Sequence, residues 1–390
     1  MKHSLARVQA ALAAEGLAGW LLYDFRGSNN VALALLSPGE RPHLTRRFLY
    51  WIPAAGEPVR LQSAVEPHHF AHLPGARRLY RSWRELEALI RELVPPGAPV
   101  AMEYSPGGAV PTVSCVDGGT LEWLRDLGVA PASSADLVQR IEAPWSEADL
   151  ASHRRAGAVV EALRGEAMAR LREDLAAGRE ATDVAVQSRL ARDLAAAGLE
   201  TDHPPVVAFG PDSGNPHHAP DPERPRRLEA GQVVLLDCWA REPEGVYADY
   251  TWMAFAGPAL PPREARVWEA VRGAREAAID FLREAFARGE EPRGRDVDRA
   301  AREVVEAAGL GDRFVHRLGH SLGREVHGPG VNLDDLETRD ERRVIEGVAF
   351  SIEPGVYLSD FGMRSEVDAL RWRGELLVSG ERQALPEFLA

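Results

Sequence analysis

The sequence predicts two domains, an α/β N-terminal domain followed by an α+β C-terminal domain. Short strand-like and helix-like segments alternate over residues 1–145, which is typical of α/β folds. Long helical segments then follow, and the chain returns to strands near its C-terminus. A length of 390 residues also exceeds what one ordinary domain holds. We therefore expect domains at residues 1–145 and 146–390.

The N-terminal domain is expected to begin with a helix over residues 5–15 and a strand over residues 19–25. Two strands joined by an "AAGEP" turn follow within residues 46–63. A helical segment, 83–94, stops at two consecutive prolines, after which a strand is expected over residues 99–104. The first helix carries polar residues and leads directly into a strand, so we expect a domain helix and not a signal peptide.

The C-terminal domain is expected to open with a long helix. Ser146, followed by Glu147 and Asp149, forms a helix-capping pattern, and the helical sequence continues to about Gly178. Further helices are expected at residues 181–197, 263–287 and 296–309. Strands are expected at residues 232–240 and 245–257, which form a hairpin, and at residues 348–358, 362–372 and 374–380.

Composition excludes several classes of function. The net charge of −13 argues against nucleic-acid binding, which requires a basic surface that neutralises phosphates. Lys2 is the only lysine, so a P-loop lysine and a lysine Schiff base are both ruled out. No stretch approaches the roughly 18 apolar residues of a membrane helix. Because Cys115 and Cys238 are the only cysteines, we expect a cytoplasmic location.

Two acidic residues interrupt the paired apolar strands. Asp237 lies in "VVLLDCWA" and Asp249 in "VYADYTWM". A buried carboxylate is costly unless it is paired, hydrogen-bonded or bound to a metal. Alternation places Thr251 on the face of Asp249 and Cys238 opposite Asp237, so Cys238 is expected to be a packed thiol and not a ligand. The competing interpretation is an edge strand with solvated aspartates.

Acidic residues interrupt the C-terminal strands in the same way. Glu353 lies in "VAFSIEPG", and Glu366 lies in "GMRSEVDALR", where Arg364 and Asp368 are expected to share its face. A surface strand with salt bridges is the competing interpretation of the second segment.

The stretch "HRLGHSLGREVHGPG", residues 316–330, contains His316, His320 and His327. Its glycines disfavour a continuous helix, and it lacks the glutamate of an H-E-x-x-H zinc helix. Taken alone, the stretch fits a surface loop with solvated histidines. Combined with two aspartates and two glutamates, one histidine completes a ligand set suited to Mn²⁺, Co²⁺ or Zn²⁺. Two such ions about 3.5–4 Å apart would bridge a hydroxide and polarise a carbonyl.

In this order, the residues resemble those of the pita-bread metallopeptidases, which include methionine aminopeptidase, aminopeptidase P and prolidase, together with the metal-free creatinase. The metal-ligand pattern of that family falls on Asp237, Asp249, His320, Glu353 and Glu366. "HRLGHSLGREVH", "SIEPGVY" and "GMRSE" are similar to the family's H-x-x-G-H-x-x-G-x-x-x-H, T-I-E-P-G-x-Y and G-x-R-x-E. "GLAGWLLYDFRGSNNVALALL" resembles the start of the creatinase and prolidase N-terminal domain.

The resemblance implies a pita-bread catalytic domain at 146–390, a creatinase-like N-terminal domain at 1–145, and a homodimer. It also implies that a hydroxide bridging two ions of Mn, Co or Zn hydrolyses the bond before proline in Xaa-Pro dipeptides or short peptides. Two alternatives remain: an aminopeptidase-P-like exopeptidase acting on longer Xaa-Pro peptides, and a non-catalytic peptide-binding protein that retains the fold.

The resemblance also assigns roles to individual side chains. Glu353 would be a metal ligand that accepts and relays the proton. His327 would bind substrate or stabilise the oxyanion, together with His217, which lies in the loop "DSGNPHHAP". His316 would bind the substrate's end, and Arg364 would pair with a ligand carboxylate or with substrate.

The interval between Asp237 and Asp249 is one residue longer than is usual in the family. We expect the extra residue to lie in the "REPEG" turn, because within a strand it would turn one aspartate away from the site. Trp252 and Val367 stand where many members carry arginine and aspartate, which bears on substrate preference.

Overall fold

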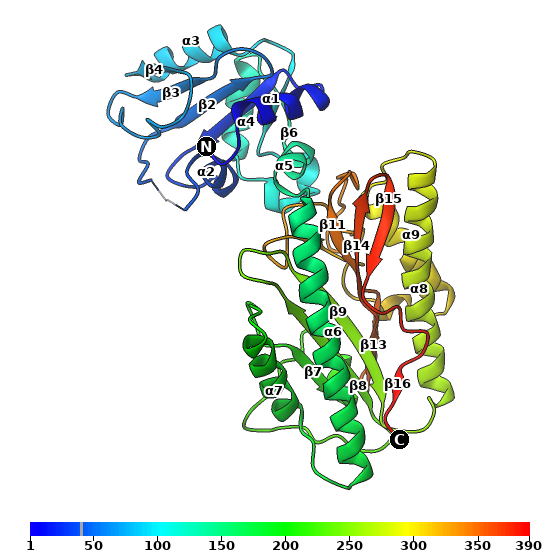
Figure 1. Ribbon diagram of the computed structural model, residues 1–390. Helices are drawn as coiled ribbons and strands as arrows, with labels where there is room; N and C mark the ends of the chain where they lie inside the picture. The colour runs from blue at the N-terminus through cyan, green and yellow to red at the C-terminus, as the bar shows by residue number, and fades with distance from the viewer. Residues whose placement is uncertain (40–41) are drawn as a thin grey trace. The chain divides into compact units, whose positions relative to one another are not determined.

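A computed structural model describes residues 1–39 and 42–390 of the chain. Two compact units, Met1–Glu142 and Ala143–Ala390, account for these residues. The sequence placed the domain boundary a few residues later, after residue 145. Figure 1 labels most of the elements of both units.

A mixed sheet in the order β4-β3-β2-β1-β5-β6 forms the centre of the N-terminal unit. Its strands are β1 (Gly19–Asp24), β2 (Phe48–Pro53), β3 (Val59–Ser63), β4 (Ala76–Tyr80), β5 (Pro99–Met102) and β6 (Ala130–Ser133). The helices of this unit are α1 (Leu5–Ala14), α2 (Asn30–Leu36), α3 (Trp83–Leu93), α4 (Gly118–Asp126) and α5 (Ala135–Glu142).

Helices cover both faces of this sheet and bury its central strands on both sides. Trp20 and Leu22 of β1 pack with residues of α1, α2 and α5. Leu21 and Tyr23, on the opposite face of the same strand, pack with residues of α3 and α4. The predicted α/β class of the N-terminal domain is confirmed by this arrangement.

A buried carboxyl lies at the end of β5. Glu103 accepts hydrogen bonds from the Trp20 indole N–H and from the Asn29 amide, both at 2.6 Å. Burial raises the pKa of Glu103 to about 7, although the hydrogen bonds from Asn29 and Trp20 lower it. Relative to the unfolded chain, the folded unit therefore favours the neutral form of this carboxyl.

Glu103→Gln is expected to remove a pH dependence of the stability of this unit. The folded pKa of about 7 lies above the ordinary value of 4.5. The stability contributed by the neutral carboxyl is therefore full below pH 4.5 and is lost as the pH rises through 7. In the wild type, the free energy of unfolding of this unit should fall by up to about 3 kcal/mol across this pH window. It can be measured in urea, with hydrogen exchange of the peptide that contains Trp20 as the probe.

Glu92→Gln is the matched control, since Glu92 is an exposed carboxylate of the same unit that pairs with Arg78. It should leave the pH dependence of the wild type in place. An unchanged pH dependence in Glu103→Gln would contradict the account of this carboxyl.

Three sheets and four α-helices form most of the described C-terminal unit, residues 143–390. The strands are β7 (Val206–Phe209), β8 (Val233–Ala240), β9 (Ala248–Phe255), β10 (Ser321–Leu322), β11 (Ala349–Ile352), β12 (Gly355–Tyr357), β13 (Gly362–Arg364), β14 (Val367–Trp372), β15 (Glu375–Ser379) and β16 (Glu387–Phe388). The sheet orders are β16-β9-β8-β7, β10-β11-β14-β15 and β12-β13. The helices are α6 (Glu147–Ala176), α7 (Asp183–Ala196), α8 (Pro262–Ala287) and α9 (Gly294–Ala307).

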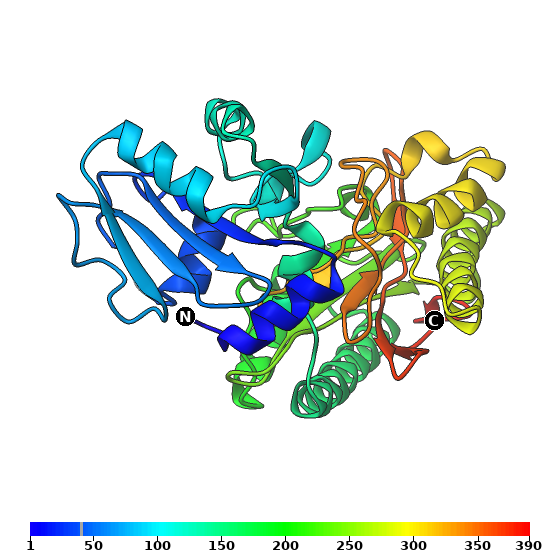
Figure 2. The same ribbon diagram turned by 90° about the horizontal axis from the view of Figure 1, so that it is seen from above.

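Helices lie on both faces of the β8–β9 hairpin. Val234 and Leu236 of β8 pack in one core with α6 and α7, whereas Val233 and Leu235 pack in another core with α8 and α9. Figure 2 shows the strands of this unit between α6 in green and α8 in yellow-green. Alternation along β8 therefore directs every second side chain toward the α8 face, including that of Asp237.

The predicted start of α6 is confirmed. The Ser146 hydroxyl accepts from the Asp149 backbone N–H while the Asp149 carboxylate accepts from the Ser146 N–H, which forms a capping box. Two sequence predictions were too simple, because the segments 348–358 and 362–372 each form two strands and not one. Within the described ranges, no helix combines the length and apolar character needed to cross a membrane.

Candidate active site

The two predicted aspartate ligands lie on one face of the β8–β9 hairpin. Asp237 is directly opposite Thr251, and Asp249 is directly opposite Trp239, in a register that continues through both strands. Residues 241–247 connect the strands. The extra residue between the aspartates therefore lies outside the strands, as predicted, and both carboxylates face the same side. Cys238 faces the opposite core and is buried, as predicted.

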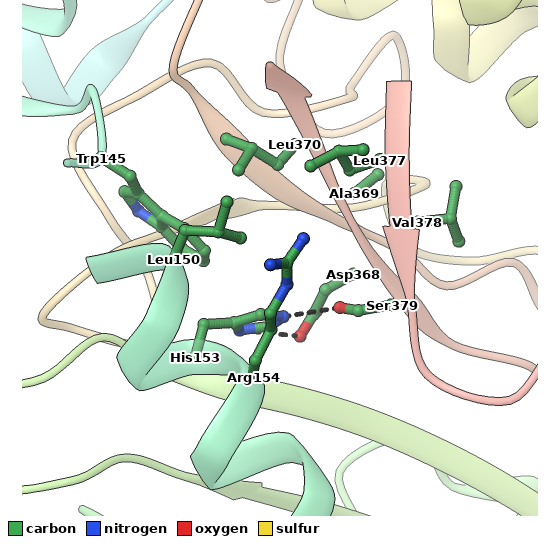
Figure 3. Close-up of a pocket in the computed structure, with 10 residues that line it drawn as sticks. All are labelled: Trp145, Leu150, His153, Arg154, Asp368, Ala369, Leu370, Leu377, Val378 and Ser379. Atoms are coloured by element: carbon green, nitrogen blue, oxygen red, sulfur yellow. Dashed lines mark hydrogen bonds and ion pairs between the residues drawn. The ribbon is translucent and has the colours of Figure 1, made fainter. Parts of the chain in front are cut away.

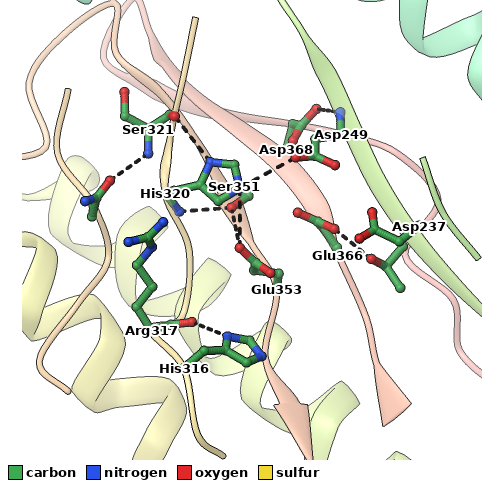
Figure 4. Close-up of polar contacts among 12 residues, drawn as sticks. Asp237, Asp249, His316, Arg317, His320, Ser321, Ser351, Glu353, Glu366 and Asp368 are labelled. Atoms are coloured by element: carbon green, nitrogen blue, oxygen red, sulfur yellow. Dashed lines mark hydrogen bonds and ion pairs between the residues drawn. The ribbon is translucent and has the colours of Figure 1, made fainter. Parts of the chain in front are cut away.

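The other predicted ligands reach this face from the C-terminal strands. His320 immediately precedes β10, Glu353 immediately follows β11, and Glu366 lies between β13 and β14. The His320 Nε2 atom is 3.5 Å from Asp249 Oδ2 and 3.5 Å from Glu353 Oε1 (Figure 4). One ligand atom each of Asp249, His320 and Glu366 lies within 4.8 Å of the others.

His320 reaches this face because a glycine precedes it. A Cβ atom on Gly319 would lie 2.0 Å from the Ser351 carbonyl oxygen, so no larger residue fits there. The His320 backbone N–H donates to the Ser351 hydroxyl at 3.0 Å, and the Ser351 N–H donates to the His320 carbonyl at 2.8 Å. The glycine thus allows the histidine segment to lie directly against β11.

Arg364 and Thr251 connect the carboxylates. The Arg364 guanidinium donates to Asp237 Oδ2 and, at 3.0 Å, to the Thr251 hydroxyl oxygen. The Thr251 hydroxyl in turn donates to Glu366 Oε2 at 2.7 Å. Of the two roles expected for Arg364, the structure therefore supports the pairing with a predicted ligand carboxylate.

Tyr357 ends the "SIEPGVY" motif, but the sequence assigned no role to its hydroxyl. Its hydroxyl accepts from Arg364 at 3.2 Å and donates to His316 Nε2 at 2.9 Å. The His316 Nδ1–H donates to the Arg317 carbonyl at 2.7 Å, which fixes the tautomer. Burial lowers the pKa of His316 to about 3, so this ring is neutral. Both nitrogens of His316 are thus engaged by protein partners, and contact with a substrate would require one of them to be exchanged.

The Asp368 carboxylate holds the backbone of Asp249 in place. Its Oδ2 atom accepts from the Asp249 backbone N–H at 2.9 Å and lies 3.9 Å from His153 Nδ1. His153 Nε2 contacts the Ser379 hydroxyl, and the three side chains line a cavity of about 100 Å³ (Figure 3). The sequence pattern placed Asp368 on the face of Glu366, but its partners, Asp249 on β9 and His153 on α6, are far away in the sequence and could not be predicted.

Three histidines near the site differ in their surroundings. His327 is exposed, and its ring lies 4.4 Å from that of His320 at nearly right angles. His217 is exposed and interacts electrostatically with Asp237. His218 lies instead 3.6 Å from Asp183 and 3.9 Å from Asp212, in a second acidic cluster that the sequence did not indicate. The loop therefore brings the first of its two histidines to the site.

The carboxylates are packed so closely that their ionised forms repel one another. Burial, followed by the neighbouring Glu366 and Asp237, raises the pKa of Asp249 well above its ordinary value. Burial, followed by Glu353 and Asp237, does the same to the pKa of Glu366. Burial also raises the pKa of Asp237, and it raises the pKa of Glu353 to about 7, with Arg364 opposing both shifts.

This donor set fits a divalent cation. Asp237 Oδ1 is buried and has no hydrogen-bond partner among the described residues, so one ligand atom remains available. Burial lowers the pKa of His320 well below its usual range, which keeps the imidazole in the neutral form that binds metals. A bound cation would offset the repulsion among the carboxylates and keep them ionised.

Comparisons with known proteins agree with this chemistry. The sequence profile of metallopeptidase family M24 matches residues 151–377. The "Probable dipeptidase PepE" of Mycobacterium bovis is 28% identical over 362 residues, covering 90% of this chain and 87% of the relative. The Xaa-Pro dipeptidase of Lactobacillus delbrueckii is 28% identical over 234 residues, covering 60% of this chain and 58% of the relative.

Solved structures show the same fold along the whole chain. Dipeptidase PepE from Mycobacterium ulcerans has a TM-score of 0.66 and 24% identity, covering 99% of this chain and 96% of its own. A prolidase from Thermococcus sibiricus has a TM-score of 0.58 and 21% identity, covering 98% of both chains. The predicted pita-bread fold with an N-terminal α/β domain is therefore confirmed. The protein is a metallopeptidase that belongs to family M24.

Proposed function

We propose that this metallopeptidase is a dipeptidase that hydrolyses the bond before proline in Xaa-Pro substrates, with two divalent cations held by Asp237, Asp249, His320, Glu353 and Glu366. The observation that carries the proposal is the convergence of four carboxylates and one neutral imidazole on one face of the β8–β9 hairpin. When bound, two ions of Mn²⁺, Co²⁺ or Zn²⁺ would lower the pKa of a water molecule and polarise the scissile carbonyl.

Glu353 is the best-placed side chain for proton transfer. Its side chain is 14% exposed, against 5% for Asp249 and 13% for Asp237, and the Asp237 carboxylate is already paired with Arg364. Glu353 is therefore the more available of the two carboxylates that reach the accessible side of the site. The Ser351 hydroxyl, 3.2 Å from Glu353 Oε1, orients the carboxylate. A carboxylate in this position can accept the proton of the attacking water and pass it to the leaving nitrogen.

Two exposed histidines, His327 and His217, lie on the accessible side of the site. His327 lies beside His320 and can donate a hydrogen bond to the oxyanion that forms at the scissile carbonyl. His217 can make the same kind of contact or hold the substrate backbone. We assign His316 to holding the Tyr357 hydroxyl, whose other partner is Arg364.

The remaining parts of the proposal rest on resemblance. The N-terminal unit is proposed to be a creatinase-like domain, and the enzyme is proposed to be a homodimer in the cytoplasm. Free Cys115 and Cys238 are compatible with a reducing compartment.

A substrate panel tests the proposed function. The purified chain, loaded with Mn²⁺, Co²⁺ or Zn²⁺ in turn, is assayed on Ala-Pro, Ala-Leu and Ala-Pro-Ala. The expected result is metal-dependent hydrolysis with the highest kcat/KM on Ala-Pro. Equal rates on Ala-Leu would contradict the proline preference, and faster cleavage of Ala-Pro-Ala would indicate an aminopeptidase of the P type. Peptide binding without hydrolysis under any metal would favour the non-catalytic alternative.

A further inference from the structure

A partly exposed tryptophan lies beside one of the proposed metal ligands. Trp239 of β8 is directly opposite Asp249 of β9 in the antiparallel register of the hairpin. Residues directly opposite each other in such a pair have their Cβ atoms about 4.5–5.5 Å apart and their side chains on one face of the sheet. The neighbours Cys238 and Ala240 pack in the opposite core, as alternation along β8 requires. The indole ring therefore starts from the face that carries the candidate ligands.

A carboxylate fixes the orientation of this ring. The Trp239 indole N–H donates to Asp202 Oδ1 at 2.6 Å. The segment of Asp202 is itself held beside the end of β8, because Glu200 and Arg241 exchange two backbone hydrogen bonds, at 2.8 and 2.9 Å. Burial raises the pKa of Asp202, but hydrogen bonds from Trp239 and His203 outweigh this effect and leave the pKa below its ordinary value. The indole therefore donates to an ionised carboxylate, which makes the hydrogen bond strong.

Trp239 lies on the accessible side of the site. Its side chain is partly exposed, and the Asp202 side chain is 43% exposed. Asp202 interacts electrostatically with His327, whose ring lies 4.4 Å from that of the proposed ligand His320. The buried part of the indole packs against the apolar cluster that includes Leu322. One part of the ring is thus fixed by the protein, and the rest is available for contact with a substrate.

The N-terminal residue of a dipeptide places its side chain close to the reacting bond. Its Cα atom is bonded to the scissile carbonyl carbon, about 1.5 Å away, and carries both the side chain and the ammonium group. Negative charge attracts the ammonium group, and Trp239 lies between two carboxylates, those of Asp202 and Asp249. An aromatic ring in this position offers an apolar surface to the side chain on the same Cα atom.

We propose that Trp239 contacts the side chain of the N-terminal residue, and that the enzyme prefers Xaa-Pro dipeptides in which this residue is apolar. Asp202 acts as the positioning residue of the indole. This inference rests on the proposed function, and it adds the preference for Xaa, which the metal ligands do not determine. Because the hydrogen bond to Asp202 already orders the ring, little conformational freedom is lost when a substrate packs against it.

The test compares Leu-Pro with Gly-Pro, which has no side chain to place on the ring, in the wild type and in Trp239→Ala. The wild type is expected to have the higher kcat/KM on Leu-Pro. Trp239→Ala should lower the ratio of the two kcat/KM values about 10-fold, because it removes part of the apolar surface that the leucine contacts. Activity on Gly-Pro should change little, which also shows that the variant is folded and loaded with metal.

Further variants separate the ring from its support. Trp239→Phe keeps an aromatic ring but cannot donate to Asp202, so its ratio should lie between those of the wild type and Trp239→Ala. Asp202→Ala should also lower the ratio, and Asp202→Asn should recover most of it because the amide oxygen can accept from the indole. Trp372→Ala is the matched control, since Trp372 is partly buried and packs against the same apolar cluster. It lies at the far end of β14 from Glu366 and should leave the ratio unchanged.

An equal loss on both dipeptides in Trp239→Ala would overturn the inference, because it would indicate a role in the fold or in the chemical step. A wild type without preference for Leu-Pro would also overturn it. If Trp239→Ala does not fold, Trp239→Phe decides the question, and a ratio equal to that of the wild type would overturn the inference.

Tryptophan fluorescence separates this inference from the proposed function. Addition of Leu-Pro to the metal-loaded wild type should change the fluorescence, and the change should be smaller in Trp239→Phe. Such a change in a protein that hydrolyses neither dipeptide would reject the function and retain the inference. Hydrolysis of both dipeptides with the same ratio in the wild type and in Trp239→Ala would retain the function and reject the inference; neither binding nor hydrolysis would reject both.

Discussion

Replacing Asp249 by alanine is expected to abolish both metal binding and peptide hydrolysis. Asp249 is buried in β9, and its Oδ2 atom lies 3.5 Å from His320 Nε2. Replacing a residue that only supports a metal ligand typically lowers metal affinity or activity about 10- to 100-fold. Loss of a ligand itself should therefore reduce kcat/KM by at least about 100-fold. Glu366→Ala should have the same effect, because Glu366 belongs to the same group of ligand atoms.

Loss of metal and loss of folding can be separated for these variants. Metal analysis should find fewer ions per chain in Asp249→Ala than in the wild type. The metal-free variant should nevertheless be more stable at neutral pH than the metal-free wild type, because removing one carboxylate relieves the repulsion that raises the pKa values of its neighbours. Asp360→Ala is the control, since Asp360 is exposed and pairs with Arg263. Full activity in Asp249→Ala or Glu366→Ala would reject the ligand assignment.

Replacing Arg364 by alanine is expected to cause the second large effect, a loss of about 3–5 kcal/mol in the free energy of unfolding of the metal-free protein. Arg364 is buried and holds Asp237, Thr251 and Tyr357 together. Its removal leaves the buried Asp237 carboxylate without a cationic partner, and this uncompensated charge is the main source of the loss. Hydrolysis should also fall, because Asp237 and Tyr357 would no longer be oriented.

Arg263→Ala is the matched control for this substitution. Arg263 also pairs with one aspartate, but both side chains are more than half exposed, at 55% and 51%. Exposed pairs contribute about 0–1 kcal/mol. A loss of stability in Arg364→Ala no larger than that in Arg263→Ala, measured by urea unfolding, would contradict the proposed role of the buried pair.

Much of the fold and of the candidate site could be predicted because both depend on local patterns. Apolar alternation fixes which face of β8 carries Asp237, and the same alternation predicts that Cys238 packs in the opposite core. The capping residues at Ser146 locate the start of α6. The placement of the extra residue in the turn after β8 follows from the requirement that both aspartates face one side.

The parts that could not be predicted depend on contacts between distant segments. Tyr357 belongs to the "SIEPGVY" motif, but its contacts could not be predicted, because only the fold places its hydroxyl between His316 and Arg364. Asp368 belongs to a strand pattern, yet its partner His153 comes from α6, far earlier in the chain.

The measurement that most directly tests the central proposal is anomalous diffraction from crystals grown with Mn²⁺. Two manganese peaks about 3.5–4 Å apart are expected, ligated by Asp237, Asp249, His320, Glu353 and Glu366. A single peak, or peaks held by other side chains, such as the cluster of Asp183, Asp212 and His218, would contradict the proposed two-metal site.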